Sequence, residues 1–118
     1  MKEKGLKENQ KTLLIFLLAT STWLVSSFLW TSPPVLSLVL FLIGVLMMLT
    51  EGHKSVIFMY AIAFMFGPLS EALFISFGAW TYADPYVFGF SMWLPFVWGN
   101  AGLFINRLNI HIRSVFFR

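Results

Sequence analysis

The chain has 118 residues, of which 58% are hydrophobic and only 11% are charged, and its formal net charge is +3. A soluble domain carries about a quarter charged residues, so the composition excludes an ordinary water-soluble fold and indicates a surface that faces lipid. There is no cysteine, which excludes disulfides and thiolate metal sites.

The charged residues concentrate at the two ends of the chain. Between positions 12 and 106 the sequence contains only four of them: Glu51, Lys54, Glu71 and Asp84. The basic residues flank apolar runs and do not form a patch with polar neighbours, so nucleic acid is not expected as a partner. Membrane lipids are the expected surroundings.

Four apolar stretches follow one another along the chain. They cover residues 12–31, 34–50, 55–77 and 91–108. Each is close to the roughly 20 residues that a helix needs to cross a bilayer core. The sequence therefore predicts an all-α fold in one domain, 1–118, built as a four-helix up-down transmembrane bundle.

The connections between these stretches are short except for the third, an aromatic loop at 78–90. After the fourth stretch, the tail at residues 109–118 alternates loosely between polar and apolar, which predicts a short interfacial helix lying in the headgroups. All eight Lys and Arg residues then fall on one side of the bundle. The positive-inside rule predicts that both termini are cytoplasmic in a multi-pass protein of the cell membrane.

Glu71 is the leading candidate for a functional residue. A carboxylate within a transmembrane span costs a few kcal/mol even on permissive insertion scales, so its presence indicates function by default. Counting from Ser55 at 1.5 Å per residue puts it roughly 24 Å up a core about 30 Å thick, in the outer third. Ala63 and Gly67 share its helix face, and small residues favour close helix packing. Glu71 is therefore expected to point into the bundle.

Depth counting also suggests partners for Glu71. The first helix should bring Ser26 and Ser27 to this level, and the fourth should bring Trp98 and Asn100. These residues predict a pocket between the first, third and fourth helices, open to the outer leaflet. The alternative is structural: a neutral Glu71 carboxyl that hydrogen-bonds to serine or asparagine and holds the helices in register.

The loop at 78–90 is the second signal. Trp80 and Tyr82 stand beside Asp84-Pro85, a dipeptide that also suits an ordinary turn. Aromatic residues at the membrane interface account for much of this composition. Because the loop is too apolar to be fully solvated, it is predicted to fold back as a lid over the bundle.

The two histidines, His53 and His111, lack a second histidine or a carboxylate at ligand spacing, so no metal site is expected and no cofactor is indicated. Small residues on the third and fourth helices form stripes that are suited to close helix contact. They predict a homodimer or docking into a larger membrane complex through Ala63, Gly67, Gly99 and Gly102.

The stretch from Glu71 to Trp98 reads E-x6-G-x-W-x-Y-x-D-P, then F-G-F-x-x-W-L-P-F-x-W. It resembles the later portion of the carotenoid hydratases of the bisanhydrobacterioruberin type, whose members are longer chains. The matching positions are Glu71, Phe77, Gly78, Tyr82, Asp84, Gly89, Pro95 and Trp98. The sequence departs from the family pattern at Trp80 and has no proline just before Trp93.

This resemblance implies that water is added to an isolated double bond of an isoprenoid or carotenoid-like lipid. Glu71 would be the acid that protonates the alkene, and Asp84 would be an alternative acid or the base that positions water. Trp80, Tyr82 and Trp98 would line the pocket and shelter the cation. Two other functions stay open: a non-enzymatic subunit or assembly factor of a larger complex, and a small proton-coupled transporter with Glu71 as the coupling site.

Overall fold

The computed structural model describes residues 6–86 and 88–117, which form four α-helices joined by turns and one long loop. The helices are α1 (Glu8–Leu29), α2 (Pro33–Glu51), α3 (Ser55–Ser76) and α4 (Leu94–Phe116). The all-helical prediction is confirmed for the described residues. By length and composition, α1, α2 and α3 are each able to cross a membrane.

The helix ends follow from local chemistry. α2 starts with Pro33 and Pro34, where the missing N–H groups would have no partner in the helix. It ends at Gly52, whose φ of +72° is the left-handed conformation that glycine tolerates, and the Gly52 N–H donates to the Met48 carbonyl at 3.1 Å. α3 ends in the same way, before Gly78 at φ +84°. Pro95 lies in the first turn of α4.

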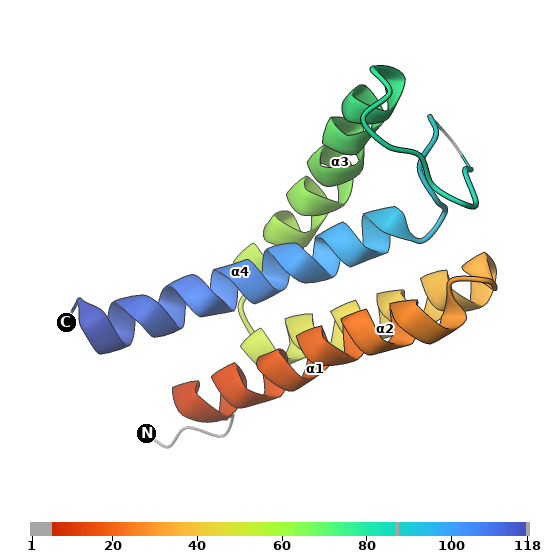
Figure 1. The fold of residues 1–118 in the computed structure, drawn as a ribbon. Coiled ribbons are helices and arrows are strands. Elements are labelled where there is room, and N and C mark those ends of the chain that lie inside the picture. Colours follow the sequence, from red (N-terminus) through yellow and green to blue (C-terminus); the bar gives the residue numbers. More distant parts are fainter. Residues whose placement is uncertain (1–5, 87, 118) are drawn as a thin grey trace.

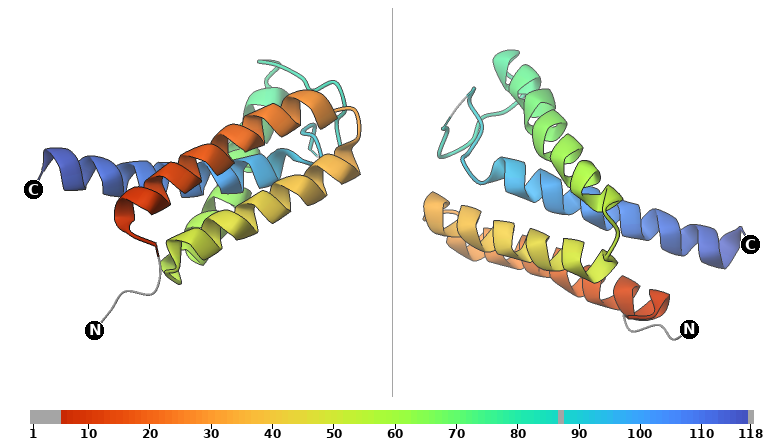
Figure 2. Two further views of the ribbon diagram at one scale, coloured as in Figure 1. Left: turned by 90° about the horizontal axis from the view of Figure 1, so that it is seen from below. Right: turned by 180° about the vertical axis from the view of Figure 1, so that it is seen from behind.

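α4 differs from the predicted fourth stretch at both ends. It begins at Leu94 and continues without a break to Phe116, so most of the predicted tail is the last two turns of one long helix. These turns project beyond the start of α1 (Figure 1). α4 and α1 thus place the two ends of the described chain at one end of the molecule, and the loop that follows α3 lies at the other (Figures 1 and 2).

Three of the helices form a bundle from which α3 diverges. α1, α2 and α4 pack against one another, whereas α3 packs mainly against α4 and meets α2 only near its own start. The described residues of α1 and α3 do not pack together. In Figure 1 the far end of α3 stands well away from α1 and α2, toward the loop.

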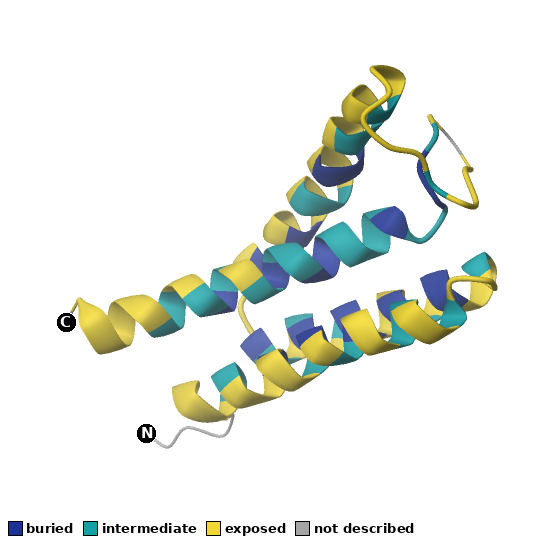
Figure 3. Cartoon of the chain, in the orientation of Figure 1, coloured by how far each residue is buried: buried dark blue, intermediate teal, exposed yellow. Residues whose placement is uncertain are grey.

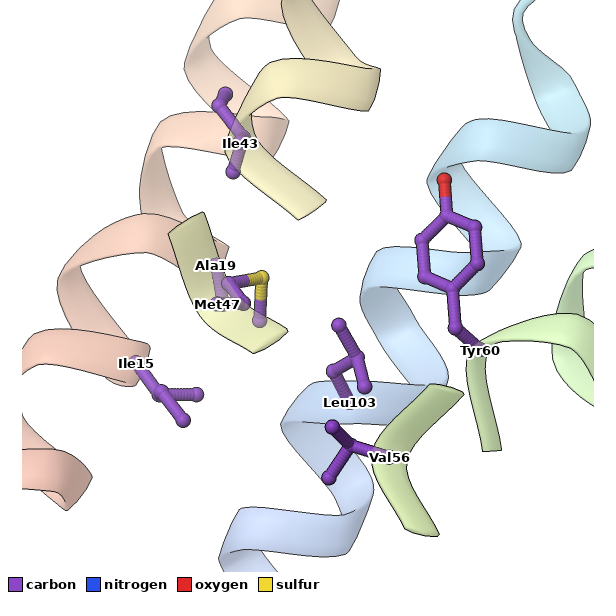
Figure 4. Close-up of a cluster of buried hydrophobic side chains, with 7 residues drawn as sticks. All are labelled: Ile15, Ala19, Ile43, Met47, Val56, Tyr60 and Leu103. Carbon is purple, nitrogen blue, oxygen red and sulfur yellow. The ribbon is translucent and has the colours of Figure 1, made fainter. Parts of the chain in front are cut away.

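The core lies where all four helices approach one another. Its seven buried apolar side chains come from every helix: Ile15, Ala19, Ile43, Met47, Val56, Tyr60 and Leu103 (Figure 4). Most of the remaining helix surface is exposed and apolar, and the outer part of α3 is exposed on most sides (Figure 3). Such a surface suits lipid, because apolar side chains there need no further cover.

Candidate functional site

The Glu71 carboxylate, about one turn before the end of α3, is held by two aromatic side chains. The Trp98 indole N–H donates to Oε2 at 2.6 Å, and the Tyr82 hydroxyl donates to Oε1. Trp98 comes from α4 and Tyr82 from the loop, so the site joins three segments that are far apart in sequence. Both carboxylate oxygens act as acceptors, which satisfies a polar group in apolar surroundings.

Gly67 explains how the Trp98 indole reaches Glu71. It lies one turn before Glu71 on the same face of α3, and a Cβ atom at Gly67 would lie 2.0 Å from Trp98 Cδ2. The Trp98 ring therefore lies directly against the α3 backbone, which only glycine permits here. From this position the indole N–H is directed at the carboxylate on the next turn.

The loop after α3 folds back on the outer end of that helix. The Ala79 N–H donates to the Phe74 carbonyl at 3.0 Å and turns the chain. Farther on, Gly89 at φ +88° lies against Ile75, where a Cβ would come 2.8 Å from Cγ2. Phe90, which follows, is buried. The loop is thus anchored to the outer end of α3 and covers Glu71 from one side.

Tyr82 and Trp80 make different ring contacts within this loop. The Tyr82 ring meets Trp93 edge-on, with ring centroids 6.1 Å apart. Burial, and after it the hydrogen bond to Glu71, raise the pKa of Tyr82 above its ordinary value of 10.0, while a smaller interaction with the Trp80 side chain opposes this rise. Trp80 is 43% exposed and packs on Phe74 with centroids 5.6 Å apart. Tyr82 thus contacts Glu71 directly, whereas Trp80 lies beside Tyr82 and covers the outer surface of α3.

Three other predicted site residues lie outside this contact set. Asp84 is exposed in the loop, and no hydrogen bond joins it to Glu71 in the described part of the chain. Ser26 and Ser27 donate to carbonyls one turn back in their own helix, at 2.8 and 2.9 Å. Because α1 and α3 do not pack together, α1 contributes nothing to the Glu71 site.

Asn100 is buried, but it lies deeper in the bundle than the Glu71 site. Its amide donates to Thr22 Oγ1 at 3.2 Å and to the Leu40 carbonyl at 3.1 Å. This side chain joins α4 to both α1 and α2. The sequence suggested Glu71 as a residue that could hold the helices in register. In the structure Asn100 has this role, because its amide connects three helices.

The small residues of α3 and α4 contact each other within the chain. A Cβ at Gly102 would lie 2.7 Å from the Ala63 methyl, and one at Gly99 would lie 2.5 Å from the Tyr60 ring. Together with the contact between Gly67 and Trp98, these contacts allow α3 and α4 to pack closely where they cross. A partner helix is not needed to explain the stripes.

An apolar groove with a volume of about 310 Å³ runs along this crossing. We call it the α3–α4 groove; its lining residues are Met59, Ile62, Ala63, Phe66, Gly67, Ser70, Trp98, Ala101, Gly102 and Ile105. Trp98 is thus a wall of the groove and a donor to Glu71. A ligand in the groove would contact the ring that holds the carboxylate.

A second polar cluster lies at the opposite end of the molecule. The Arg107 side chain is 2% exposed and forms a bidentate pair with Glu51, which is 4% exposed, with Nε 2.7 Å from Oε2. Arg107 Nη1 also lies 2.9 Å from an oxygen of Glu8. Lys11 Nζ donates to the Glu51 backbone carbonyl at 3.1 Å. The cluster fastens α1, α2 and α4 together.

This cluster was not predicted from the sequence, where Glu51 falls in a short connection and Arg107 counts among the basic residues that flank apolar runs. The available signal was that Glu51 directly follows the second apolar stretch and that Arg107 lies within the fourth. No protein-family model, curated protein or solved structure matches the chain, so its function has to be inferred from these two clusters and the groove.

Proposed function

We propose that the chain is a four-span integral membrane protein with both termini in the cytoplasm. α1, α2 and α3 are long and apolar enough to cross a membrane. α4 has 23 residues and would reach about 34 Å at 1.5 Å per residue, but it carries more polar residues. Its most costly polar side chains, Asn100 and Arg107, are buried against other helices, which is how spans accommodate such groups.

The orientation rests on the basic residues. In this topology Lys54 in the α2–α3 turn lies on the same side as both chain ends, and the opposite side has no Lys or Arg. The Glu71 site and its loop would then face the outer leaflet.

The function we propose for this protein is to bind an apolar, isoprenoid-like lipid chain in the α3–α4 groove, beside Glu71. One observation carries it: Trp98 lines an apolar groove of about 310 Å³ and donates its only N–H to Glu71. Glu71 is not a lining residue of the groove but is bonded to the Trp98 ring that lines it, and a concave groove with mostly apolar walls is the usual form of a lipid or cofactor site. Lateral opening to the bilayer would let the ligand enter from the membrane.

Binding is better supported than hydration of a double bond. An acid that protonates an alkene has to present a proton to it, whereas both oxygens of Glu71 accept hydrogen bonds from Tyr82 and Trp98. Asp84, the other candidate acid, is exposed in the loop. Hydration by Glu71 would require this arrangement to open.

The two other candidate functions have weaker support. Docking on a partner helix was predicted from small residues that already pack between α3 and α4. A proton pathway from Glu71 across the bundle would have to pass a fully buried apolar layer that includes Ile15, Met47 and Leu103. A homodimer remains a prediction that the stoichiometry of the purified protein would test.

The test compares two serine variants. Ser70→Phe places a ring in the groove, because the exposed Ser70 side chain lines it. Ser27→Phe makes the same change at an exposed position of α1, where the hydroxyl also bonds only its own helix. Each protein is purified in mild detergent, and bound lipid is measured by mass spectrometry after extraction.

We expect an isoprenoid-like lipid to co-purify with the wild-type and Ser27→Phe proteins. The amount of bound lipid should be at least about tenfold lower in Ser70→Phe, which corresponds to a loss of about 1.4 kcal/mol in binding free energy. Equal lipid content in all three proteins would refute the groove as the site. Glu71→Gln, assayed with added carotenoid, separates binding from chemistry: a hydrated product that disappears in this variant would refute binding without hydration.

A further inference from the structure

The end of the molecule opposite Glu71 contains a polar cleft of about 320 Å³. All four helices contribute to it, and its polar walls include Glu8, Lys11, Glu51, His53, Asn106 and Arg107. We call it the basal cleft. Two of its walls, Arg107 and Glu51, are more than nine-tenths buried, so the cleft has a fixed floor and is not a gap between mobile surface chains.

The negative charges of the basal cleft are already neutralised. Both oxygens of Glu51 accept from Arg107. One oxygen of Glu8 accepts from Arg107 at 2.9 Å, and the other lies 3.4 Å from Lys11 Nζ. Two carboxylates thus face two cations. A cationic ligand would find no free carboxylate here.

Several hydrogen-bond donors of the cleft remain unused. Lys11 Nζ has three N–H groups but, among residues 6–86 and 88–117, only two acceptors, the Glu51 carbonyl and Glu8. The Nδ1 atom of His53 accepts from the Ser55 backbone N–H at 3.1 Å and lies 2.8 Å from the Ser55 hydroxyl, whereas no hydrogen bond in the described part of the chain involves Nε2. The Asn106 amide forms no hydrogen bond within the described residues. The cleft therefore offers donors and suits a ligand rich in acceptors.

We infer that the basal cleft binds the phosphate group of an anionic membrane lipid. A phosphate oxygen accepts well from lysine, histidine and amide donors. The charges of the cleft balance one another, so a phosphate would gain these unused donors and the cations that Glu8 occupies. Val56 and Ile110, which also line the cleft, provide apolar contact for the start of the acyl chains. The inference rests on the proposed topology but not on a ligand in the α3–α4 groove.

Glu8 is the internal competitor for this phosphate. Its side chain is 65% exposed, yet it occupies Arg107 Nη1 and lies near Lys11. A phosphate in the cleft would take over these donors as Glu8 turns outward. Substitutions on the two sides of the cleft should then have opposite effects on phosphate binding.

The experiment measures the dissociation constant of full-length protein in detergent for short-chain phosphatidic acid, with short-chain phosphatidylcholine and inorganic phosphate as comparison ligands. We expect Lys11→Gln to weaken phosphatidic acid binding about tenfold, because the variant lacks the charge-assisted hydrogen bond from Nζ to the phosphate. Glu8→Gln should strengthen binding. Asn106→Ala, which breaks no contact between described side chains, should weaken it severalfold even if Lys11→Gln impairs folding.

Arg113→Gln is the matched control, because it removes one exposed cation from the same end of α4 outside the cleft. Arg113→Gln should change the dissociation constant for phosphatidic acid by less than about twofold, as expected for a surface charge that salt screens. An equal effect of Arg113→Gln and Lys11→Gln, or equal binding of phosphatidylcholine, would overturn the inference. Inorganic phosphate binding as tightly as phosphatidic acid would show a free-anion site and overturn the lipid assignment. Ser70→Phe, which blocks the α3–α4 groove, should leave the dissociation constants for all three ligands unchanged. The basal cleft and the groove can therefore be tested independently.

Discussion

The buried Arg107–Glu51 pair makes the clearest energetic prediction. Removing one partner of a buried ion pair costs about 3–5 kcal/mol, because the other charge remains buried without compensation. The loss in free energy of unfolding caused by Arg107→Leu should lie at the upper end of this range, since the Glu51 carboxylate then has no cation bound to its oxygens. Glu51→Leu should lie at the lower end, because Arg107 retains Glu8 at 2.9 Å.

The double variant Arg107→Leu/Glu51→Leu tests the reasoning behind these values. Replacing both charges by apolar side chains removes the uncompensated charge and is often neutral or stabilising. We therefore expect the double variant to be more stable than either single variant, with a coupling free energy of about 3 kcal/mol or more. Glu8 and Lys11 would still pair with each other at 3.4 Å.

Reversible unfolding in mixed micelles, followed by far-UV circular dichroism, measures the free energy of unfolding of all four proteins. Arg113→Leu serves as the control: this exposed cation of the same helix should change stability by no more than about 0.5 kcal/mol. Single variants that each cost less than about 1 kcal/mol, or costs that simply add in the double variant, would refute the claim that the pair is buried and coupled.

Three further predictions concern the rest of the bundle. Asn100→Leu should lower the free energy of unfolding by about 1–2 kcal/mol, because two buried hydrogen bonds disappear; a loss below about 0.5 kcal/mol in the same titration would contradict this. Gly67→Ala should displace the Trp98 ring, lower stability by about 1–3 kcal/mol and shift tryptophan emission; an emission spectrum identical to that of the wild type would contradict this contact. The raised pKa of Tyr82 favours the protonated hydroxyl in the folded state, so its contribution to stability is complete below pH 10.0 and is lost as the pH rises above that value. Tyr82→Phe should remove this part of the alkaline loss, and an identical pH profile in both proteins would contradict the assignment.

The helices could be predicted from hydrophobic runs, but their ends could not. The predicted first stretch begins at residue 12, whereas α1 begins at Glu8, where the Lys7 N–H donates to the Gln10 side chain. The sequence predicts a separate interfacial helix after residue 108, whereas α4 continues through these residues to Phe116 without a break. Polar turns form helix as readily as apolar ones, since the backbone hydrogen bonds are the same. Hydropathy therefore indicates the part of a helix that meets lipid, but it does not reveal how far the helix extends at its polar ends.

The level of a residue along its helix could also be predicted, whereas the neighbouring helix that its side chain faces could not. Counting residues brought Ser26 and Trp98 to the level of Glu71, but only Trp98 contacts it. Ser26 bonds its own helix because a serine hydroxyl reaches the carbonyl one turn back without any partner. Which helices are neighbours depends on packing over the whole bundle, and α3 diverges from α1 because its small residues pack on α4.

The Arg107–Glu51 pair was hidden for a related reason. Each residue lies at the end of an apolar run, where charged side chains usually reach water. Their pairing requires that α2 and α4 turn the two residues toward each other, and nothing local in either segment specifies that rotation. Two charges 56 positions apart can be matched only once the packing of the helices is known.

Photocrosslinking tests the central claim, that the α3–α4 groove holds an apolar lipid chain beside Glu71, most directly. The protein is reconstituted in vesicles with a diazirine-bearing isoprenoid, irradiated and mapped by peptide mass spectrometry. We expect labels concentrated on groove residues such as Phe66, Ser70 and Trp98, which disappear in Ser70→Phe but persist in Ser27→Phe. Labels spread evenly over lipid-exposed residues such as Leu24 and Phe28 of α1, and unchanged by Ser70→Phe, would contradict it.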